Sequence, residues 1–257
     1  MKITLSCICH LLSAARGCRL PAAGYRNSLN PISYLLSPSR RGLAAAAVMA
    51  LALGAATSWG QTTITQWTFE QTGISTNSPA PATGSGTASV VGSMGTLSIA
   101  TGTSGGESQT TGTSAWAIGN AAPGSNESSG FQFLVSTVGY TNIIFQYDHR
   151  ISNTGTRTVR IQYTTNGSTW INLDVTSSNL TSGGATKAGI DNGRIDVANP
   201  VGEARSDAWN RRTINFSSVA GVANNANFGI RIVAATYSTT GQFRTANAAA
   251  TVATGGT

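Results

Sequence analysis

The segment IIFQYDHRISNTGTRTVRIQYTTNGSTW, residues 143–170, carries Asp148, His149 and Arg150 side by side. A carboxylate, an imidazole and a guanidinium are groups that general acid–base chemistry uses. The segment alternates apolar and polar residues, which is typical of β-strands, and successive strand side chains point to opposite faces. His149 therefore shares a face with Tyr147, while its two charged neighbours point the other way. Because adjacent strand residues cannot converge on one substrate, we interpret this trio as structural.

The two strands predicted on either side of SNTG carry opposite charges on their polar faces. Their apolar faces are formed by Ile143, Phe145 and Tyr147 on the first strand and by Val159, Ile161 and Tyr163 on the second. Keeping both apolar faces on one side of a hairpin requires a loop of three or five residues, not four. A three-residue loop sets Asp148 directly opposite Arg160, and a five-residue loop makes them diagonal neighbours. We predict a structural salt bridge between these two residues and a half-buried His149.

Two Asn-Gly pairs mark further turns. In TTNGSTW, a three-residue turn with Gly167 in the left-handed region sets Ile171 and Leu173 on the apolar face, and we prefer it to a two-residue turn. In IDNGRI, a two-residue Asn-Gly turn sets Asp191 opposite Arg194. The overlapping DNGRID superficially resembles a calcium loop, but it lacks the alternating carboxylates and the closing Glu.

Residues 1–60 have the composition of an export signal with an extended amino-terminal region. They carry six Lys and Arg and no Asp or Glu, and the apolar run GLAAAAVMALALGAATSWG follows Arg41. This order is typical of a secretory leader, and we predict cleavage after Gly60, with Ala56 as the alternative. SRRGLA also resembles a twin-arginine signal, and both routes lead out of the cytoplasm. The run is too short and Ala-rich for a membrane span, so we expect no transmembrane span in the mature chain.

Removing this leader changes the charge and the chemistry that remain. The whole chain has 16 Lys and Arg, 9 Asp and Glu, three Cys and two His. The mature part keeps 10 basic and 9 acidic residues, a net charge of +1, so we expect no direct nucleic-acid binding. It keeps no cysteine and only His149, which excludes thiolate chemistry and leaves no Ser-His-Asp set to assemble. We expect no enzyme activity. A carboxylate pair for glycoside hydrolysis stays open because any two of the nine acids could meet, but nothing in the sequence singles out a pair.

Residues 61–257 predict an all-β fold. Short alternating segments recur between turn residues, namely TITQWTF, GTASVVG, GTLSIAT, SAWAIG, GFQFLVSTVG, NRRTINFSSVAGV and NFGIRIVAATYS. No helical period persists, and β-branched residues dominate the apolar positions. We expect one domain with a long irregular insertion at 176–208 and a poorly ordered tail at 239–257.

Taken together, TITQWTFE, PATGSGTASVVG, FQFLVSTVGYTN with the opening segment, and WNRRTINFSSVAGVANNANFGIRIVAAT resemble a domain of bacterial secreted proteins. It occurs near the amino terminus of some extracellular nucleases and in surface proteins with a sorting tail. The resemblance implies an antiparallel jelly-roll β-sandwich of the galactose-binding type, non-catalytic in itself, whose chain runs on into a final strand. We therefore expect a fragment lacking its last strand, with strand 63–69 as the unpaired neighbour. Glu70 would then lose a partner for a structural metal; calcium stays possible and no other cofactor is expected.

The resemblance and the aromatic residues predict a secreted or cell-surface binding or adhesion module, with extracellular polysaccharide or cell-surface glycan as the favoured partner. The mature chain retains four Trp, namely Trp67, Trp116, Trp170 and Trp209. Sugar sites use exposed aromatic faces beside polar groups. Trp116 and Trp209 lie in loop-like surroundings and are the candidate ligand-binding residues, whereas Trp67 is expected in the core. The alternative is a structural accessory domain of a larger extracellular enzyme such as a nuclease.

Overall fold

The computed structural model describes residues 2–8, 61–93, 95–100, 114–119, 124–151, 155–184, 189–196 and 210–245. The described strands are β1 (Lys2–Ile8), β2 (Gln61–Trp67), β3 (Thr87–Val91), β4 (Thr96–Ala100), β5 (Ala115–Gly119), β6 (Gly130–Leu134), β7 (Ile143–His149), β8 (Thr158–Thr164), β9 (Ile171–Leu173), β10 (Leu180–Gly184), β11 (Gly189–Asp191), β12 (Arg194–Asp196), β13 (Asn210–Asn215) and β14 (Gly229–Ala234). Within these ranges there is no helix, and hence none that could span a membrane.

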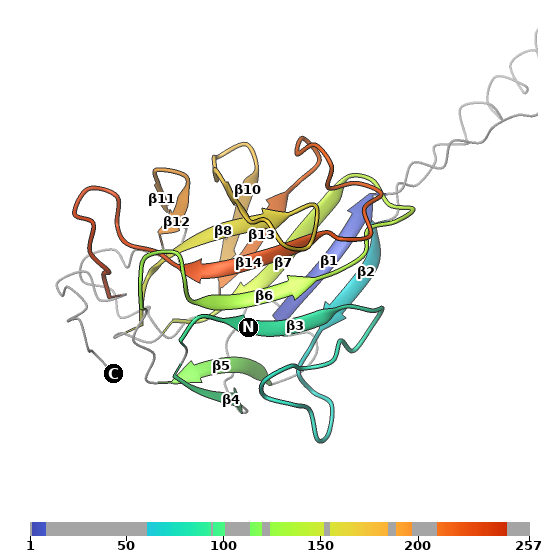
Figure 1. The fold of residues 1–257 in the computed structure, drawn as a ribbon, viewed down its shortest axis with the longest axis horizontal. Coiled ribbons are helices and arrows are strands. Elements are labelled where there is room, and N and C mark those ends of the chain that lie inside the picture. The colour runs from blue at the N-terminus through green and yellow to red at the C-terminus, as the bar shows by residue number, and fades with distance from the viewer. Residues whose placement is uncertain are drawn as a thin grey trace, which may run out of the picture. The chain divides into compact units, whose positions relative to one another are not determined.

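The strands form two antiparallel sheets packed face to face (Figure 1). Sheet A has the order β10-β13-β7-β1-β2, and sheet B has the order β11-β12-β8-β14-β6-β3, with β9 also paired to β8. Strands β4 and β5 form a separate pair. Contacts between aromatic rings join the sheets. The ring centroids of Trp67 and Phe133 lie 5.1 Å apart, and those of Tyr163 and Phe216 lie 6.1 Å apart. The predicted all-β, antiparallel sandwich is confirmed.

Alternation along each strand decides which side chains fill the space between the sheets. In β7, Ile143, Phe145 and Tyr147 are each only 1% exposed, whereas Ile144 and Gln146 between them are partly exposed on the outer side. The core-facing side chains of other strands are buried in the same way, among them Trp67 of β2, Ile161 of β8 and Ile230 of β14. Burying one face of every strand removes its apolar surface from water, which is the main stabilising contribution to such a fold.

The Asn-Gly turn of IDNGRI has the predicted geometry. Asp191 lies opposite Arg194 in the β11–β12 pair. Asn192 and Gly193 have φ angles of 46° and 75°. Positive φ at both central residues is what a two-residue hairpin turn of type I′ requires, and Asn and Gly tolerate it best.

The loop between β8 and β9 is wider than predicted. Gly167 adopts the expected left-handed conformation, with φ of 77°. Ile161 pairs with Leu173, however, so the register is shifted by two residues while the predicted face is kept. The cause is the Asn166 side chain, whose Oδ1 accepts the backbone N–H groups of Ser168 (3.0 Å) and Thr169 (2.7 Å) and so builds a larger loop.

Strands β7 and β8 do not form the predicted hairpin. Strand β7 lies in sheet A between β13 and β1, whereas β8 lies in sheet B beside β14. Both bury their predicted apolar faces, but they do so from opposite sides of the core. Alternation specifies which face of a strand is buried and leaves open which sheet the strand joins.

An unexpected strand lies inside sheet A, next to its edge strand β2. Strand β1 comes from the predicted export leader and pairs antiparallel with both β2 and β7, with Leu5 opposite Thr65 on one side and Phe145 on the other. The sequence predicts an unpaired edge along residues 63–69, and β1 lies at that position. In Figure 1 it is the blue arrow between the cyan β2 and the green-yellow β7.

The described residues of the predicted insertion and tail form strands and turns. The insertion contains β10, which pairs with β13 in sheet A, and the β11–β12 pair at the end of sheet B. The first part of the predicted tail folds back, because Gly241 N–H donates to the Tyr237 carbonyl at 2.8 Å and Thr245 forms a bridge with Thr156. Residues 185–188, 197–209 and 246–257 lie outside the described ranges.

Candidate ligand-binding face

A row of polar side chains crosses the outer face of sheet B. Backbone pairing sets Ser89, Gln132, Arg231, Gln162 and Asn172 opposite one another on β3, β6, β14, β8 and β9. None of the five is buried, because alternation turns them away from the core that their sequence neighbours fill. We call these five residues the polar row.

Hydrogen bonds link the row in two halves. Gln132 Nε2 donates to Ser89 Oγ at 3.3 Å, and Arg231 Nε donates to Gln132 Oε1 at 2.8 Å. On the other half, Gln162 Nε2 donates to Asn172 Oδ1 at 3.0 Å. Between the halves, Arg231 Nη1 and Nη2 and Gln162 Oε1 have no hydrogen-bond partner among the described residues. The centre of the row therefore presents both donors and an acceptor to solvent.

Trp170 lies beside the centre of the polar row. The Arg231 guanidinium carbon lies 3.9 Å from the centroid of the Trp170 ring, a cation–π contact that fixes both planar groups. Trp170 follows the loop organised by Asn166 and precedes β9, and its ring is partly exposed. Burial lowers the pKa of Arg231 from its ordinary value, but a guanidinium keeps its charge at neutral pH.

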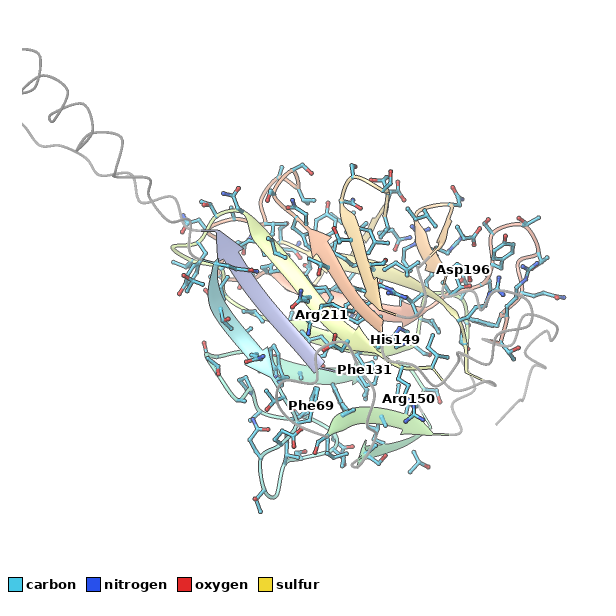
Figure 2. The ribbon with its side chains drawn as sticks, turned by 180° about the vertical axis from the view of Figure 1, so that it is seen from behind. Phe69, Phe131, His149, Arg150, Asp196 and Arg211 are labelled. Atoms are coloured by element: carbon cyan, nitrogen blue, oxygen red, sulfur yellow. The ribbon has the colours of Figure 1, made fainter. Side chains whose placement is uncertain are left out.

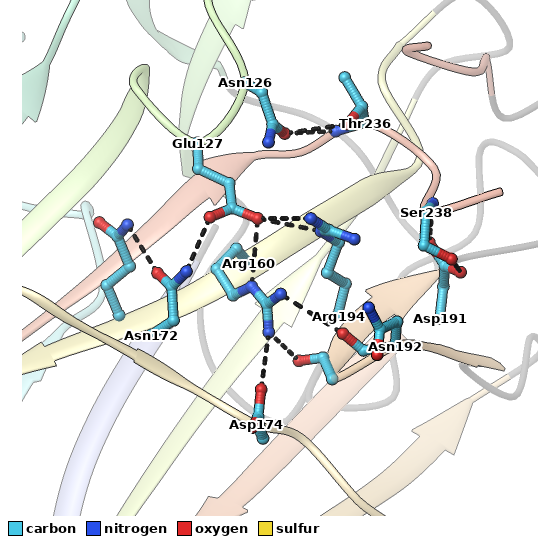
Figure 3. Close-up of polar contacts among 12 residues, drawn as sticks. Asn126, Glu127, Arg160, Asn172, Asp174, Asp191, Asn192, Arg194, Thr236 and Ser238 are labelled. Atoms are coloured by element: carbon cyan, nitrogen blue, oxygen red, sulfur yellow. Dashed lines mark hydrogen bonds and ion pairs between the residues drawn. The ribbon is translucent and has the colours of Figure 1, made fainter. Parts of the chain in front are cut away.

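A cluster of charged residues borders the row (Figure 3). Glu127 Oε1 accepts from Arg160 Nε at 3.3 Å and from Arg194 Nε at 3.0 Å, and Arg194 Nη2 lies 2.9 Å from the same oxygen. Arg160 Nη1 also reaches Asp174 Oδ1 at 3.2 Å. We call these four residues the arginine clamp; Asn172 Nδ2 joins it to the polar row by donating to Glu127 Oε2 at 2.9 Å.

The arginine clamp neutralises its own charges. Burial alone would raise the pKa of Glu127, but hydrogen bonds from Arg194 and Asn172 and the charge of Arg160 outweigh burial, so its pKa lies below the ordinary value. Glu127 is therefore ionised at neutral pH. Since Arg160 Nη1 also donates to the Gly193 carbonyl at 2.9 Å, the clamp ties the β11–β12 turn to strand β8.

The predicted salt bridge between Asp148 and Arg160 is wrong. Asp148 Oδ1 accepts from Arg211 Nε at 3.1 Å, on the outer face of sheet A. Arg160 lies on the outer face of sheet B in the arginine clamp. Figure 2 views the molecule from the side of sheet A and shows Arg211 there. Both predicted polar faces point away from the core as expected, but the two strands belong to different sheets.

The first predicted sugar-binding tryptophan also needs correction. Trp116 is 2% exposed, its Nε1 donates to the Thr76 carbonyl at 2.7 Å, and its ring lies 4.6 Å from that of Phe131. A ring enclosed in this way cannot stack on a sugar. Trp209, the second candidate, lies outside the described residues. Trp170 was not selected from the sequence, although it precedes Asn172 by two residues and so shares the polar face of that strand.

The remaining predicted residues have structural contacts. Glu70 Oε1 accepts from Ser114 N at 2.6 Å, which ties the segment after β2 to the residue before β5. His149 is partly buried, as predicted, with its ring 6.0 Å from that of Tyr147. Among the described residues, no group of three or more His, Cys, Asp and Glu could hold a metal ion.

Comparison of the chain with protein-family models, with curated proteins and with solved structures finds no match. The outer face of sheet B is therefore interpreted from its own chemistry.

Proposed function

We propose that this protein is a secreted, non-catalytic β-sandwich module that binds extracellular polysaccharide or cell-surface glycan through the outer face of sheet B. The observation that carries this proposal is the polar row with Trp170 beside its centre. Sugars combine apolar C–H faces, which pack on aromatic rings, with hydroxyl groups that need donors and acceptors. Trp170, Arg231 and Gln162 offer both kinds of contact from one partly exposed surface.

The length of the polar row favours an extended ligand. Adjacent strands lie about 4.8 Å apart, so a row across five strands is about 19 Å long. A ligand that contacts the whole row would therefore be an oligosaccharide or polysaccharide chain and not a single sugar. The composition of residues 1–60 supports export, which would bring this face into contact with extracellular glycans.

The first prediction tests Trp170. Replacing Trp170 with Ala is expected to weaken polysaccharide binding about tenfold or more, because an aromatic anchor at a binding surface is commonly worth that much. Affinity electrophoresis against a panel of soluble neutral and acidic polysaccharides would measure the change. Thermal unfolding of the variant would verify that the sandwich stays folded.

Gln146 provides a matched control on the opposite sheet. Its Nε2 donates to Thr213 Oγ1 at 2.9 Å on the outer face of sheet A, as the glutamines of the polar row do on sheet B. Gln146→Ala should leave binding unchanged. Absence of binding by the unmodified protein across the panel, or equal binding by the Trp170 variant, would contradict the proposal.

The alternative is a structural accessory domain of a larger extracellular enzyme. It is favoured by the arginine clamp, whose charges are satisfied internally and hold surface loops in place without a ligand. Failure to bind any polysaccharide, with the fold intact, would favour this alternative.

A further inference from the structure

We propose that the centre of the polar row is an anion subsite, so that the glycan ligand is an acidic polysaccharide whose carboxylate or sulfate groups bind Arg231. This inference rests on the proposed function and specifies the class of ligand. It follows from how Arg231 is held, from the charges around it, and from the donors that it leaves unused.

Arg231 is held rigidly at the place where a ligand would lie. Trp170 contacts its guanidinium from one direction, with 3.9 Å to the ring centroid, and Gln132 fixes its Nε through a bond of 2.8 Å. These contacts leave Nη1 and Nη2 without a partner among the described residues. A planar guanidinium with fixed orientation and free N–H groups matches a carboxylate or sulfate oxygen pair, and it has already lost much of the side-chain entropy that binding would otherwise cost.

The charge on this face is concentrated at Arg231. Arg160 and Arg194 bind Glu127, and Arg160 also binds Asp174, so the arginine clamp has no net charge. Arg231 makes no ion pair with any described carboxylate. An approaching anion therefore meets one uncompensated positive charge, while the nearby carboxylates are neutralised by arginines. The adjoining Gln162 Oε1 can accept a sugar hydroxyl beside the anion.

The test compares polysaccharides that differ in charge. Full-length protein would be titrated with polygalacturonate, with its fully methyl-esterified form, and with dextran sulfate beside neutral dextran. We expect binding to at least one anionic polymer that is about tenfold tighter than to its neutral counterpart, and a preference that weakens as salt rises. Tighter binding to polygalacturonate identifies carboxylate as the preferred anion, and tighter binding to dextran sulfate identifies sulfate.

Two variants locate the subsite. Arg231→Gln should abolish the preference for anionic over neutral polymer, and Arg231→Lys should retain part of it because the charge remains. Arg244 is the matched control, since its guanidinium also stacks on an aromatic ring, at 3.7 Å from the centroid of Tyr237, without an ion pair to a described carboxylate. Arg244→Gln should leave the preference intact. Thermal unfolding of each variant confirms that the fold is unchanged.

The outcomes separate this inference from the function on which it rests. One outcome is that the protein binds neutral and anionic polymers equally, and that Trp170→Ala weakens this binding whereas Arg231→Gln does not. The anion subsite is then overturned, while the binding function stands. If Arg231→Gln and Arg244→Gln weaken anion binding alike, the attraction is diffuse and the subsite is again overturned. If no polymer binds, the proposed function itself fails.

Discussion

His149 is the only histidine of residues 61–257. Its environment makes the stability of the fold depend on pH. Burial lowers the pKa of His149 to about 3, and the charge of Arg212 acts in the same direction. In an unfolded chain an imidazole has a pKa of about 6.5. Between these two pH values the native state binds fewer protons than the unfolded state, so the free energy of unfolding decreases as the pH falls.

Replacing His149 with Gln should therefore flatten the pH dependence of stability between about pH 6.5 and pH 4. A single proton accounts for at most about 1.4 kcal/mol of unfolding free energy per pH unit in this window. Urea unfolding of both proteins at stepped pH would measure the difference. Because Asp148 beside it is common to both proteins, the difference between the two profiles isolates the imidazole. Parallel profiles would show that His149 is not protected from protons in the native state.

At the level of strands, two ion pairs of sheet B differ sharply in burial. Arg157 Nε and Nη2 each lie 2.9 Å from the Asp196 carboxylate, with both side chains less than a tenth exposed, and this pair joins the segment before β8 to β12. Asp174 also binds an arginine, Arg160, but its side chain is 83% exposed. Water screens the second pair and not the first, so the two aspartates should contribute very differently to stability.

Asp196→Asn should lower the free energy of unfolding by about 3–5 kcal/mol, because it leaves the buried Arg157 charge uncompensated. Asp174→Asn is the control and should cost at most about 1 kcal/mol. Chemical denaturation of both variants beside the unmodified protein gives the comparison. Equal losses would mean that the Arg157–Asp196 pair is hydrated in solution.

Local patterns could be predicted from the sequence, and long-range partners could not. Asp191 and Arg194 face each other because an Asn-Gly turn between them sets the register, and that pairing is confirmed. The partner of Arg160 was predicted wrongly, since Glu127 lies 33 residues away in the chain and no period links the two. The exposure of Trp116 was predicted wrongly for the same reason. The residues around it in the sequence are typical of a loop, but Phe131, which is distant in the sequence, packs against its ring.

At the scale of the whole molecule, sheet A contains a strand of the predicted leader. Strand β1 precedes the predicted cleavage site after Gly60, and the other strands of the sheet follow it. Strand β1 pairs with β2 over residues 61–67 and with β7 over residues 143–148. Both neighbours run antiparallel to β1, so they run parallel to each other. Without β1, the facing edges of β2 and β7 would carry unpaired N–H and C=O groups, which favour aggregation or pairing with another strand.

A protein that begins at Gln61 should therefore be less stable and more prone to aggregate than the full chain, with a lower midpoint of thermal unfolding. Amide hydrogen exchange should locate the loss, since the amides of β2 and β7 that face β1 would exchange faster. Those of β8 and β14 in sheet B serve as the internal control, because their backbone pairing does not involve β1. Adding a synthetic peptide with the β1 sequence KITLSCI should restore part of the protection by occupying the position between the two strands. Equal midpoints and unchanged exchange in β2 and β7 would show that sheet A does not need β1, and that removing the leader leaves a complete sandwich.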